Sequence, residues 1–458
     1  MKKIIKISFN DKTIYYEVES GQSSTDINYL LNNNFEINKP TRITFDSYPR
    51  ITFCLEISST CNLRCTYCFN VEKKNKLMSK EDIKDILDNL FDKYKNKDKY
   101  FIDLSGDGEP LTNLEGILFV AEYSKKKQEE IRKEINVSFV TNGTLLTKEA
   151  IDKIQDTGII LYGISIDGPR KYHNSNRIFG NNKGTYKQIF NNIKNIDHKE
   201  FLGCAMTLSN NVFNLTKELI KLNKTFNTIS VKPVRSLYFD NDIVLKWCEE
   251  YEKLTLYLLE RINNNDYKLM FSLLNGDDYF GKFISKVFNN GISLNRCDAG
   301  GGRIFVNIDK EVYPCVPLGQ YNEYRCDMVD FNANKFQNIL DEGYAKTSCS
   351  HCDFVSLCGG ECFVEKLMHN GINSNMCLFK KKLISLAIYL KEEIKQNVTS
   401  YNKIKEFILS KRKLLGMDKN YKDIVNNNPD LTFKECKEIY YKSISRDNDS
   451  IDNKIRGE

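Results

Sequence analysis

The chain has 458 residues, with 67 Lys and Arg against 61 Asp and Glu, and therefore a formal net charge of +6 at pH 7. At about 150 residues per domain, this length predicts two to four domains with a sizeable core. Hydrophobic residues make up 41% and charged residues 28%, which excludes fibrous, low-complexity and disordered classes. The mild and dispersed charge also argues against a nucleic-acid partner.

Neither a membrane span nor a signal core is visible in the sequence. No apolar run approaches the roughly 20 residues that a bilayer-spanning helix needs, and the first ten residues alternate polar and apolar side chains. We therefore expect a cytoplasmic protein without a membrane partner. In that reducing compartment the 15 cysteines have no use as a disulfide scaffold, so metal binding is the leading explanation for them.

The N-terminal region, residues 1–49, predicts a β-rich lead-in. Alternating apolar residues lie on both sides of the polar turn Asn10-Asp11-Lys12, which is a hairpin pattern. From about residue 50 to 265, short apolar runs alternate with longer amphipathic runs. The predicted strands are 51–57, 100–104, 137–140, 159–166, 202–208 and 229–234, and the predicted helices include 80–94, 114–127, 148–156, 186–196 and 215–222.

Six β-then-α units in series predict an α/β fold, a partial (β/α)6 TIM-like barrel with a parallel sheet and helices outside it. In such a fold the chemistry collects at the C-terminal ends of the strands. Turn signals such as Asn275-Gly276-Asp277-Asp278 predict a bridging segment over 266–296. Residues 297–379 predict a small cysteine-rich domain, and residues 380–458 a helical extension with one firm helix around Leu383 to Leu390. Trp247 is predicted to lie in a helix core.

The first group of chemistry-bearing residues is Cys61-x3-Cys65-x2-Cys68, directly after the first barrel strand. Three thiolates on one tight loop can bind three irons of a cubane cluster and leave the fourth iron without a protein ligand. The alternatives are a zinc knuckle or three ordinary thiols. A structural zinc site normally has four ligands, and no histidine or fourth cysteine lies close by in the sequence.

This C-x3-C-x2-C spacing, with the aromatic Tyr67 before the third cysteine, resembles the signature of the radical S-adenosylmethionine (SAM) superfamily. The resemblance implies a [4Fe-4S] cluster on Cys61, Cys65 and Cys68, with SAM chelated at the open iron. Cleavage of SAM would then give a 5′-deoxyadenosyl radical that removes a hydrogen atom from the substrate.

Three later segments occupy the positions where that family places its SAM contacts. Gly106-Asp107-Gly108-Glu109-Pro110 resembles the Gly-Gly-Glu-Pro motif, with Asp107 in place of the first paired glycine. Thr141–Thr144 ends the third strand, Ser165–Pro169 ends the fourth, and Arg177 follows as the expected partner of the SAM carboxylate, which a guanidinium suits. The SAM contacts implied by the resemblance are Tyr67, Gly108, Glu109, Pro110, Asn142, Ser165, Asp167 and Arg177.

A second cysteine array contains seven thiols, which exceed what one metal can use. It resembles the SPASM extension of radical SAM enzymes in its spacing, except that Lys310 replaces a glycine of the pattern. A pair of zinc ribbons is the alternative. The array consists of Cys297, Cys315, Cys349, Cys352, Cys358, Cys362 and Cys377.

The resemblance implies two auxiliary [4Fe-4S] clusters, which makes three clusters in the chain. The second auxiliary cluster would take Cys349, Cys352, Cys358 and Cys377, whereas the first has only Cys297, Cys315 and Cys362. Its fourth position could be filled by Cys326, by Asp298 or water, or by a substrate thiolate at an open iron. The remaining cysteines are predicted to be small buried hydrophobes, namely Cys54, Cys204, Cys248, Cys326 and Cys436.

The SPASM group acts mostly on peptides, so the resemblance predicts a maturase that installs a thioether or carbon–carbon crosslink in a ribosomally made precursor peptide. A flavodoxin- or ferredoxin-like reductant would be a further partner. An anaerobic sulfatase-maturating type that forms formylglycine is the alternative, but its aspartate base corresponds to Val316 here, which cannot accept a proton. A non-enzymatic iron–sulfur electron-transfer protein is a third reading, which leaves the SAM-contact segments unexplained. The sequence names no catalytic residue.

The route by which a leader peptide would be held is open at this stage. Many maturases of this type carry an N-terminal peptide-recognition domain about twice as long as the lead-in before residue 50. The extension over 380–458 is therefore a candidate binding surface.

Overall fold

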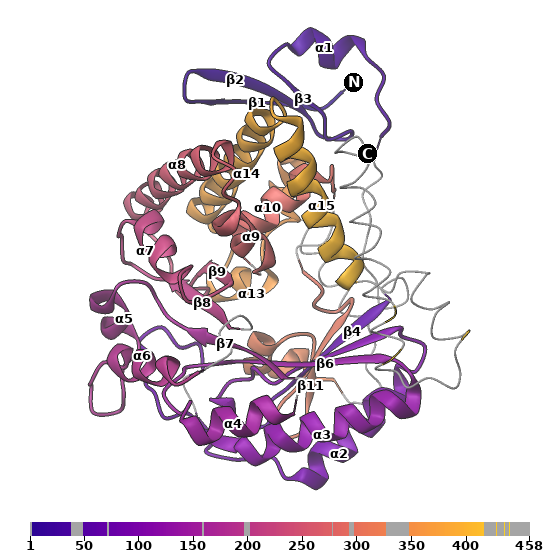
Figure 1. The fold of residues 1–458 in the computed structure, drawn as a ribbon, viewed down its shortest axis with the longest axis vertical. Coiled ribbons are helices and arrows are strands. Elements are labelled where there is room, and N and C mark those ends of the chain that lie inside the picture. The colour runs from indigo at the N-terminus through magenta and orange to yellow at the C-terminus, as the bar shows by residue number, and fades with distance from the viewer. Residues whose placement is uncertain are drawn as a thin grey trace.

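The computed structural model describes residues 2–37, 49–70, 73–157, 160–196, 202–276, 278–292, 297–326 and 348–415, and the single residues 427, 435 and 439. The polar tail and Cys436 lie outside the described residues. A curved sheet with helices against its outer face occupies the lower half of the molecule in Figure 1, and a group of helices occupies the upper half.

The predicted partial barrel is confirmed. Six strands run parallel in the order of the sequence, each hydrogen-bonded to the next, and alternate with helices on the outer face. Their apolar side chains face those helices, as at Phe53, which packs against Phe91 and Tyr100. The strands are β4 (Arg50–Leu55), β5 (Lys99–Asp103), β6 (Glu134–Thr141), β7 (Ile160–Ser165), β8 (Gly203–Leu208) and β9 (Thr228–Pro233).

The barrel helices form where the apolar spacing and caps predict them. Ser79 and Thr147 cap two of them by accepting backbone N–H bonds from Asp82 and Ala150. A short helix, α5, was not predicted from the sequence, and a 3₁₀-helix, η1, opens at Pro110. These elements are α2 (Lys80–Lys93), η1 (Pro110–Asn113), α3 (Leu114–Ile131), α4 (Lys148–Asp156), α5 (Arg170–Asn176), α6 (Tyr186–Lys194) and α7 (Leu215–Leu222).

The segment predicted as a bridge, 266–296, is helical over most of its described part. Helices α9 (Lys268–Asn275) and α10 (Tyr279–Phe288) meet at Gly276 and Asp278. The Asp278 carboxylate caps α10 by accepting from Gly281 N (2.7 Å), and it also accepts from Val231 N of β9 (2.9 Å). The turn signals therefore mark a helix–helix corner that is tied to the sheet.

The cysteine-rich region contributes to the barrel sheet itself. Strand β10 (Arg303–Val306) pairs parallel with β4, so that Phe305 lies opposite Cys54, and β11 (Val312–Tyr313) pairs antiparallel with β10. Lys310, in the turn between them, has φ of 65°, a conformation that glycine adopts without strain. This positive φ explains why the family pattern has a glycine at this position.

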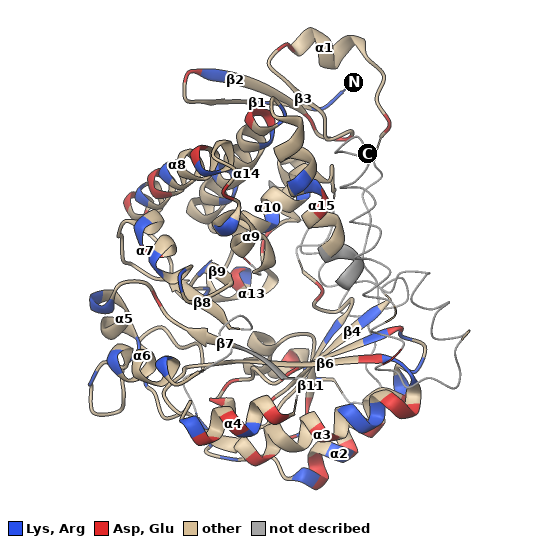
Figure 2. Cartoon of the chain, viewed as in Figure 1, with Lys and Arg blue, Asp and Glu red and all other residues tan. Residues whose placement is uncertain are grey.

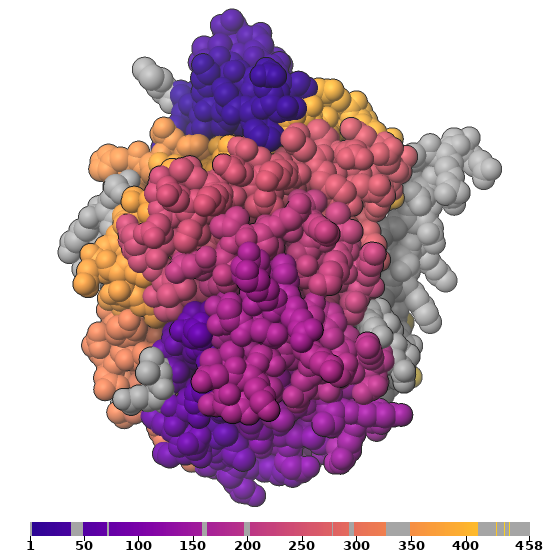
Figure 3. Space-filling model, turned by 90° about the vertical axis from the view of Figure 1, so that its left-hand side faces the viewer, coloured from indigo at the N-terminus to yellow at the C-terminus, as the bar shows by residue number. Residues whose placement is uncertain are grey.

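The N-terminal hairpin is also confirmed, and it belongs to a small sheet seated on the last helices. Lys12 pairs with Glu393 (2.7 Å), and Asn10 Nδ2 donates to the Tyr389 hydroxyl (3.1 Å). Figure 3 shows this module as an indigo cap over the helical half. Its elements are β1 (Ile4–Phe9), β2 (Lys12–Glu17), β3 (Ser23–Ser24) and α1 (Ile27–Asn32).

Helix α14 (Ser374–Ile394) is the firm helix predicted around Leu383, and it packs between the N-terminal sheet and the helices α8 (Asn241–Asn263) and α10. A second long helix, α15 (Val398–Leu415), follows it. Trp247 is buried in α8 against Phe239 and Phe379, as predicted. Acidic and basic residues are interspersed along the helices in Figure 2. Within the described ranges, no helix has the length and apolar character to cross a bilayer.

Candidate active site

The cysteine loop after β4 is fixed by main-chain and side-chain bonds to the segment after β6 and to the residues on either side of Arg177. Arg64 N donates to Ile178 O (2.8 Å) and Thr66 N to Asn176 O (2.9 Å). Asn62 bonds to both Asn142 and Thr144 (2.8 Å each). The loop is therefore positioned by the segments that the sequence singled out as SAM contacts.

The three thiols of this loop lie close to one another. Burial raises the pKa of the Cys65 thiol to about 11, the Arg177 guanidinium opposes that rise, and Cys68 and Cys61 lie near enough to add to it. A bound metal or cluster would stabilise the thiolates and so offset the free-energy cost of deprotonating these buried thiols. The donor chemistry therefore fits an iron–sulfur cluster at this loop.

Glu109 is the structural anchor of the Gly-rich turn after β5. Its buried carboxylate accepts from the Thr141 hydroxyl (2.5 Å), from Asn142 N (2.7 Å) and from Leu111 N (3.2 Å). Burial raises the pKa of Glu109 and these donors lower it. At Gly108 an added Cβ would lie 2.3 Å from Ser58 O, so only glycine fits where the turn crosses the cysteine loop.

Asp167 and Arg177 form a buried ion pair behind the cysteine loop. Arg177 Nε donates to Asp167 Oδ2 at 3.0 Å, and the Tyr67 hydroxyl donates to the same oxygen. The guanidinium also lies over the Tyr67 ring, 5.6 Å from its centroid. Four of the predicted SAM contacts are thus close together: Tyr67 and this pair are in direct contact, and Ser165 ends the adjoining strand.

His173 holds the Asp167–Arg177 pair in place, a role that the sequence gave no reason to expect. Its fully buried ring accepts from Asp167 N at Nδ1 (3.1 Å), so Nε2 carries the proton and donates to Thr185 Oγ1 (2.9 Å). Thr185 in turn donates to Arg177 O (2.9 Å). Burial lowers the pKa of His173 to about 4, so the ring is neutral near pH 7.

Asp107, the residue that departs from the family glycine, lies at the same edge. Its Oδ2 accepts from Gln320 Nε2 (2.9 Å) and its backbone oxygen accepts from Asn70 Nδ2 (3.0 Å). Burial raises the pKa of Asp107 to about 7 and that of the neighbouring Glu56 to about 8. Two carboxyl groups with raised pKa therefore lie at the ends of β4 and β5.

The second cysteine array separates into two groups in space. Burial raises the pKa of Cys315, and Cys297 and Cys362 are the cysteines that add to this effect. For Cys377 burial raises the pKa to about 12, and the contributing cysteines are Cys358 and Cys349. These neighbours follow the two ligand sets implied by the sequence resemblance.

Of the candidates for the missing fourth ligand, Asp298 is held in an ion pair, and Cys326 is positioned by its backbone. Asp298 accepts from Arg303 Nε (3.0 Å), and Cys326 pairs through its backbone with Val312 (2.8 Å). Cys54 is not a simple apolar filler, because Arg303 Nη1 donates to its sulfur at 2.9 Å. The sequence could not indicate this contact, since the two residues lie on different strands 249 positions apart.

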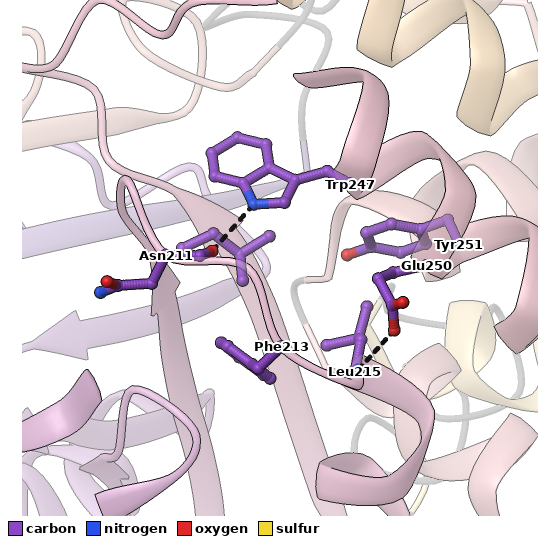
Figure 4. Close-up of a pocket in the computed structure, with 7 residues that line it drawn as sticks. Asn211, Phe213, Leu215, Trp247, Glu250 and Tyr251 are labelled. Carbon is purple, nitrogen blue, oxygen red and sulfur yellow. Dashed lines mark hydrogen bonds between the residues drawn. The ribbon is translucent and has the colours of Figure 1, made fainter. Parts of the chain in front are cut away.

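No three histidine, cysteine, aspartate or glutamate side chains in the described part of the chain converge as ligands of one metal ion. A cubane spreads its cysteines over separate irons, whereas a zinc ion needs four ligands around one point. A small cavity between α8 and the β8–α7 loop is lined by Trp247, Glu250 and Tyr251 (Figure 4), and no cysteine lines it.

Comparison with known proteins identifies the barrel. Residues 55–218 match the model of the radical SAM superfamily. These residues form a radical SAM domain. This family binds a [4Fe-4S] cluster and SAM, and the matched residues include the three-cysteine loop, Glu109 and Arg177.

The radical SAM chain is similar to curated enzymes over most of its length. It is 27% identical to a cysteine-type anaerobic sulfatase-maturating enzyme of Clostridium novyi (strain NT), covering 70% of this chain and 90% of that enzyme. It is 22% identical to the mycofactocin maturase MftC of Mycolicibacterium smegmatis, covering 68% and 77%.

A solved structure, native anSMEcpe with bound AdoMet and Cp18Cys peptide, has the same fold. The TM-score is 0.61 at 20% identity, over 78% of this chain and all of that one. The shared fold supports the partial-barrel description.

Proposed function

We propose that this radical SAM enzyme is a peptide maturase, which abstracts a hydrogen atom from a ribosomally made peptide and installs a thioether or carbon–carbon crosslink. The observation that carries the proposal is the convergence, at one sheet edge, of the Cys61 loop, the Glu109 turn and the Asp167–Arg177 pair. Two further thiol groups, around Cys315 and Cys377, lie in the region that follows the barrel.

The cofactors are assigned to residues as follows. Cys61, Cys65 and Cys68 would hold the SAM-binding cluster, and Arg177, with Tyr67 beside it, would orient the SAM carboxylate. When bound, cluster and SAM supply a 5′-deoxyadenosyl radical. The two auxiliary [4Fe-4S] clusters would complete a SPASM-type domain, the first on Cys297, Cys315 and Cys362 and the second on Cys349, Cys352, Cys358 and Cys377.

The peptide class is supported by the relatives, whose names describe maturation of sulfatases and of mycofactocin. Formylglycine formation is the second candidate, and the sulfatase-maturase relatives favour it. Val316 argues against it, because valine follows Cys315 where the family's base would lie and valine cannot take a proton. A flavodoxin- or ferredoxin-like protein would supply the electron.

The test is anaerobic incubation of the chain with SAM, dithionite and the peptides encoded beside its gene. We expect 5′-deoxyadenosine, and a loss of about 2 Da in one peptide, since a crosslink removes two hydrogens. Cys65→Ala should abolish both products, and Cys248→Ala, which lies in α8, should not. Formylglycine in a sulfatase peptide would favour the second candidate, and absence of 5′-deoxyadenosine would contradict both.

A further inference from the structure

Crosslinking through a cysteine, or oxidising a cysteine or serine, releases a proton from the peptide side chain. A positioned base near neutral pKa accelerates such a step by about 10²–10⁴-fold. Because Val316 cannot serve, another residue at the strand ends must accept the proton if the enzyme provides a base.

The acids that line this edge are mostly committed to internal bonds. Both oxygens of Glu109 accept from the protein. Asp167 accepts from Tyr67 and Arg177 at Oδ2 and from Thr207 N at Oδ1 (3.2 Å). Each of these carboxylates is therefore a structural acceptor with no oxygen left for a substrate proton.

Asp103 and Asp309 are also engaged. Asp103 accepts from Ser105 N (3.0 Å) and lies 3.5 Å from Arg303. Asp309 pairs with both Lys74 and Lys76. A carboxylate held by cations has a lowered proton affinity, as the lowered pKa of Asp309 illustrates, so Asp309 does not suit a base at neutral pH.

Asp107 differs from all four. Its Oδ1 is buried and has no hydrogen-bond partner among the described residues, while Oδ2 is fixed by Gln320. Asn70, only 4% exposed, presents a second buried acceptor, Oδ1, without a partner beside the same turn. Buried polar atoms are nearly always paired, so two adjacent unpaired acceptors indicate a ligand that carries donors.

The main chain and the side chain of Asp107 face different segments. Its main-chain oxygen faces Asn70, two residues after Cys68, whereas its carboxyl group faces Gln320. Gln320 ends the 3₁₀-helix η3 (Val316–Gln320) that begins directly after Cys315. The carboxyl group thus lies between the cysteine loop and the region of the first auxiliary thiols, where a peptide would have to lie to meet both.

We propose that Asp107 Oδ1 is the general base, accepting one proton from a thiol or hydroxyl of the bound peptide, with Gln320 as its positioning residue. The step moves a proton from S–H or O–H to the carboxylate and transfers no electrons. The raised pKa, near neutrality, suits this task, and Glu56, Lys74 and Asp309 are the charged groups around the carboxyl. The proposal rests on the peptide-modifying function proposed above.

The test compares Asp107→Asn, Asp107→Glu and the control Glu115→Gln, which removes the charge of an exposed carboxyl on α3 outside the site. The probes are SAM alone for binding, and the Cp18Cys peptide and the neighbouring-gene peptides for turnover. We expect Asp107→Asn to bind SAM within about twofold of wild type and to form 5′-deoxyadenosine with peptide. Modified peptide should fall by about 10²-fold, as for loss of a general base. Asp107→Glu should recover part of the loss, and Glu115→Gln should match wild type.

Two results would overturn the assignment. A tenfold or larger rise in the SAM dissociation constant of Asp107→Asn would make Asp107 a nucleotide contact, and wild-type yields of modified peptide would leave it without a role. Neither result touches the proposed function, because wild type would still modify the peptide. Failure of wild type to form 5′-deoxyadenosine with every probe would instead remove the function and the base together.

Discussion

At the scale of single residues, the site depends on side chains that hold other side chains. His173, Thr185 and the Asp167–Arg177 pair form one buried chain of hydrogen bonds behind the cysteine loop. Removing one member of a buried ion pair costs several kcal/mol, because the other charge is left without compensation. The orientation of Arg177 is therefore fixed by the fold before any ligand binds.

His173 should make the stability of the protein depend on pH. The folded ring is not protonated until about pH 4, whereas an unfolded histidine takes a proton near pH 6.5. The unfolded state therefore binds more protons between these values, and the free energy of unfolding falls as pH drops from about 6.5 to 4. The contribution is about 2 kcal/mol between pH 7.5 and 5.

The measurement is denaturant unfolding at several pH values, under anaerobic conditions, of wild type and His173→Gln. Glutamine can make both hydrogen bonds without titrating, so the variant should lose about 2 kcal/mol less over that pH range. His369→Gln, a half-exposed histidine, is the control. Parallel pH curves for wild type and His173→Gln would show that the buried ring does not resist protonation.

Residue roles were predictable from sequence only where a residue belongs to a contiguous motif. The spacing of Cys61, Cys65 and Cys68 and the Gly-Glu-Pro turn identified the site. The contact of Cys54 with Arg303 and that of Asp107 with Gln320 join residues more than two hundred positions apart. Such contacts depend on how distant segments of the chain pack together, and they leave no local pattern in the sequence.

At the scale of elements, periodicity placed the barrel strands and helices to within a few residues. The sequence predicts a bridging segment over 266–296 without specifying its helices, because Gly276 and the Asp278 cap, which end one helix and begin the next, give only a turn signal. Helix α5 was missed because its seven residues, Arg170–Asn176, are too few for an apolar period to appear.

Lys391 connects its own helix, α14, to the N-terminal module and to the C-terminal end of α10. Its removal tests how much such a connection between elements contributes to stability. Its buried ammonium donates to Gly21 O (3.0 Å), Val287 O (2.9 Å) and Asn290 Oδ1 (2.7 Å). Lys391→Met would leave these acceptors without a donor and should lower the free energy of unfolding by about 2–4 kcal/mol. Thermal unfolding measures the effect, with the exposed Lys381→Met as control. Equal losses in the two variants would contradict the bridging role.

At the scale of the whole molecule, the chain should contain three independent clusters. We expect about twelve irons per chain after anaerobic purification and reconstitution, and about eight when Cys61, Cys65 and Cys68 are all changed to alanine. Iron and acid-labile sulfide analysis measures both values. Zinc in place of iron, or complete iron loss in the triple variant, would contradict three separate sites.

The pairing of β10 with β4 has a consequence for any attempt to divide the protein. A fragment that stops before residue 297 would keep every barrel helix yet strip β4 of its neighbour, exposing a row of backbone donors and acceptors along a buried apolar strand. Such edges recruit strands from other molecules. The barrel alone should therefore be prone to self-association, because the cysteine-rich region is what covers this edge.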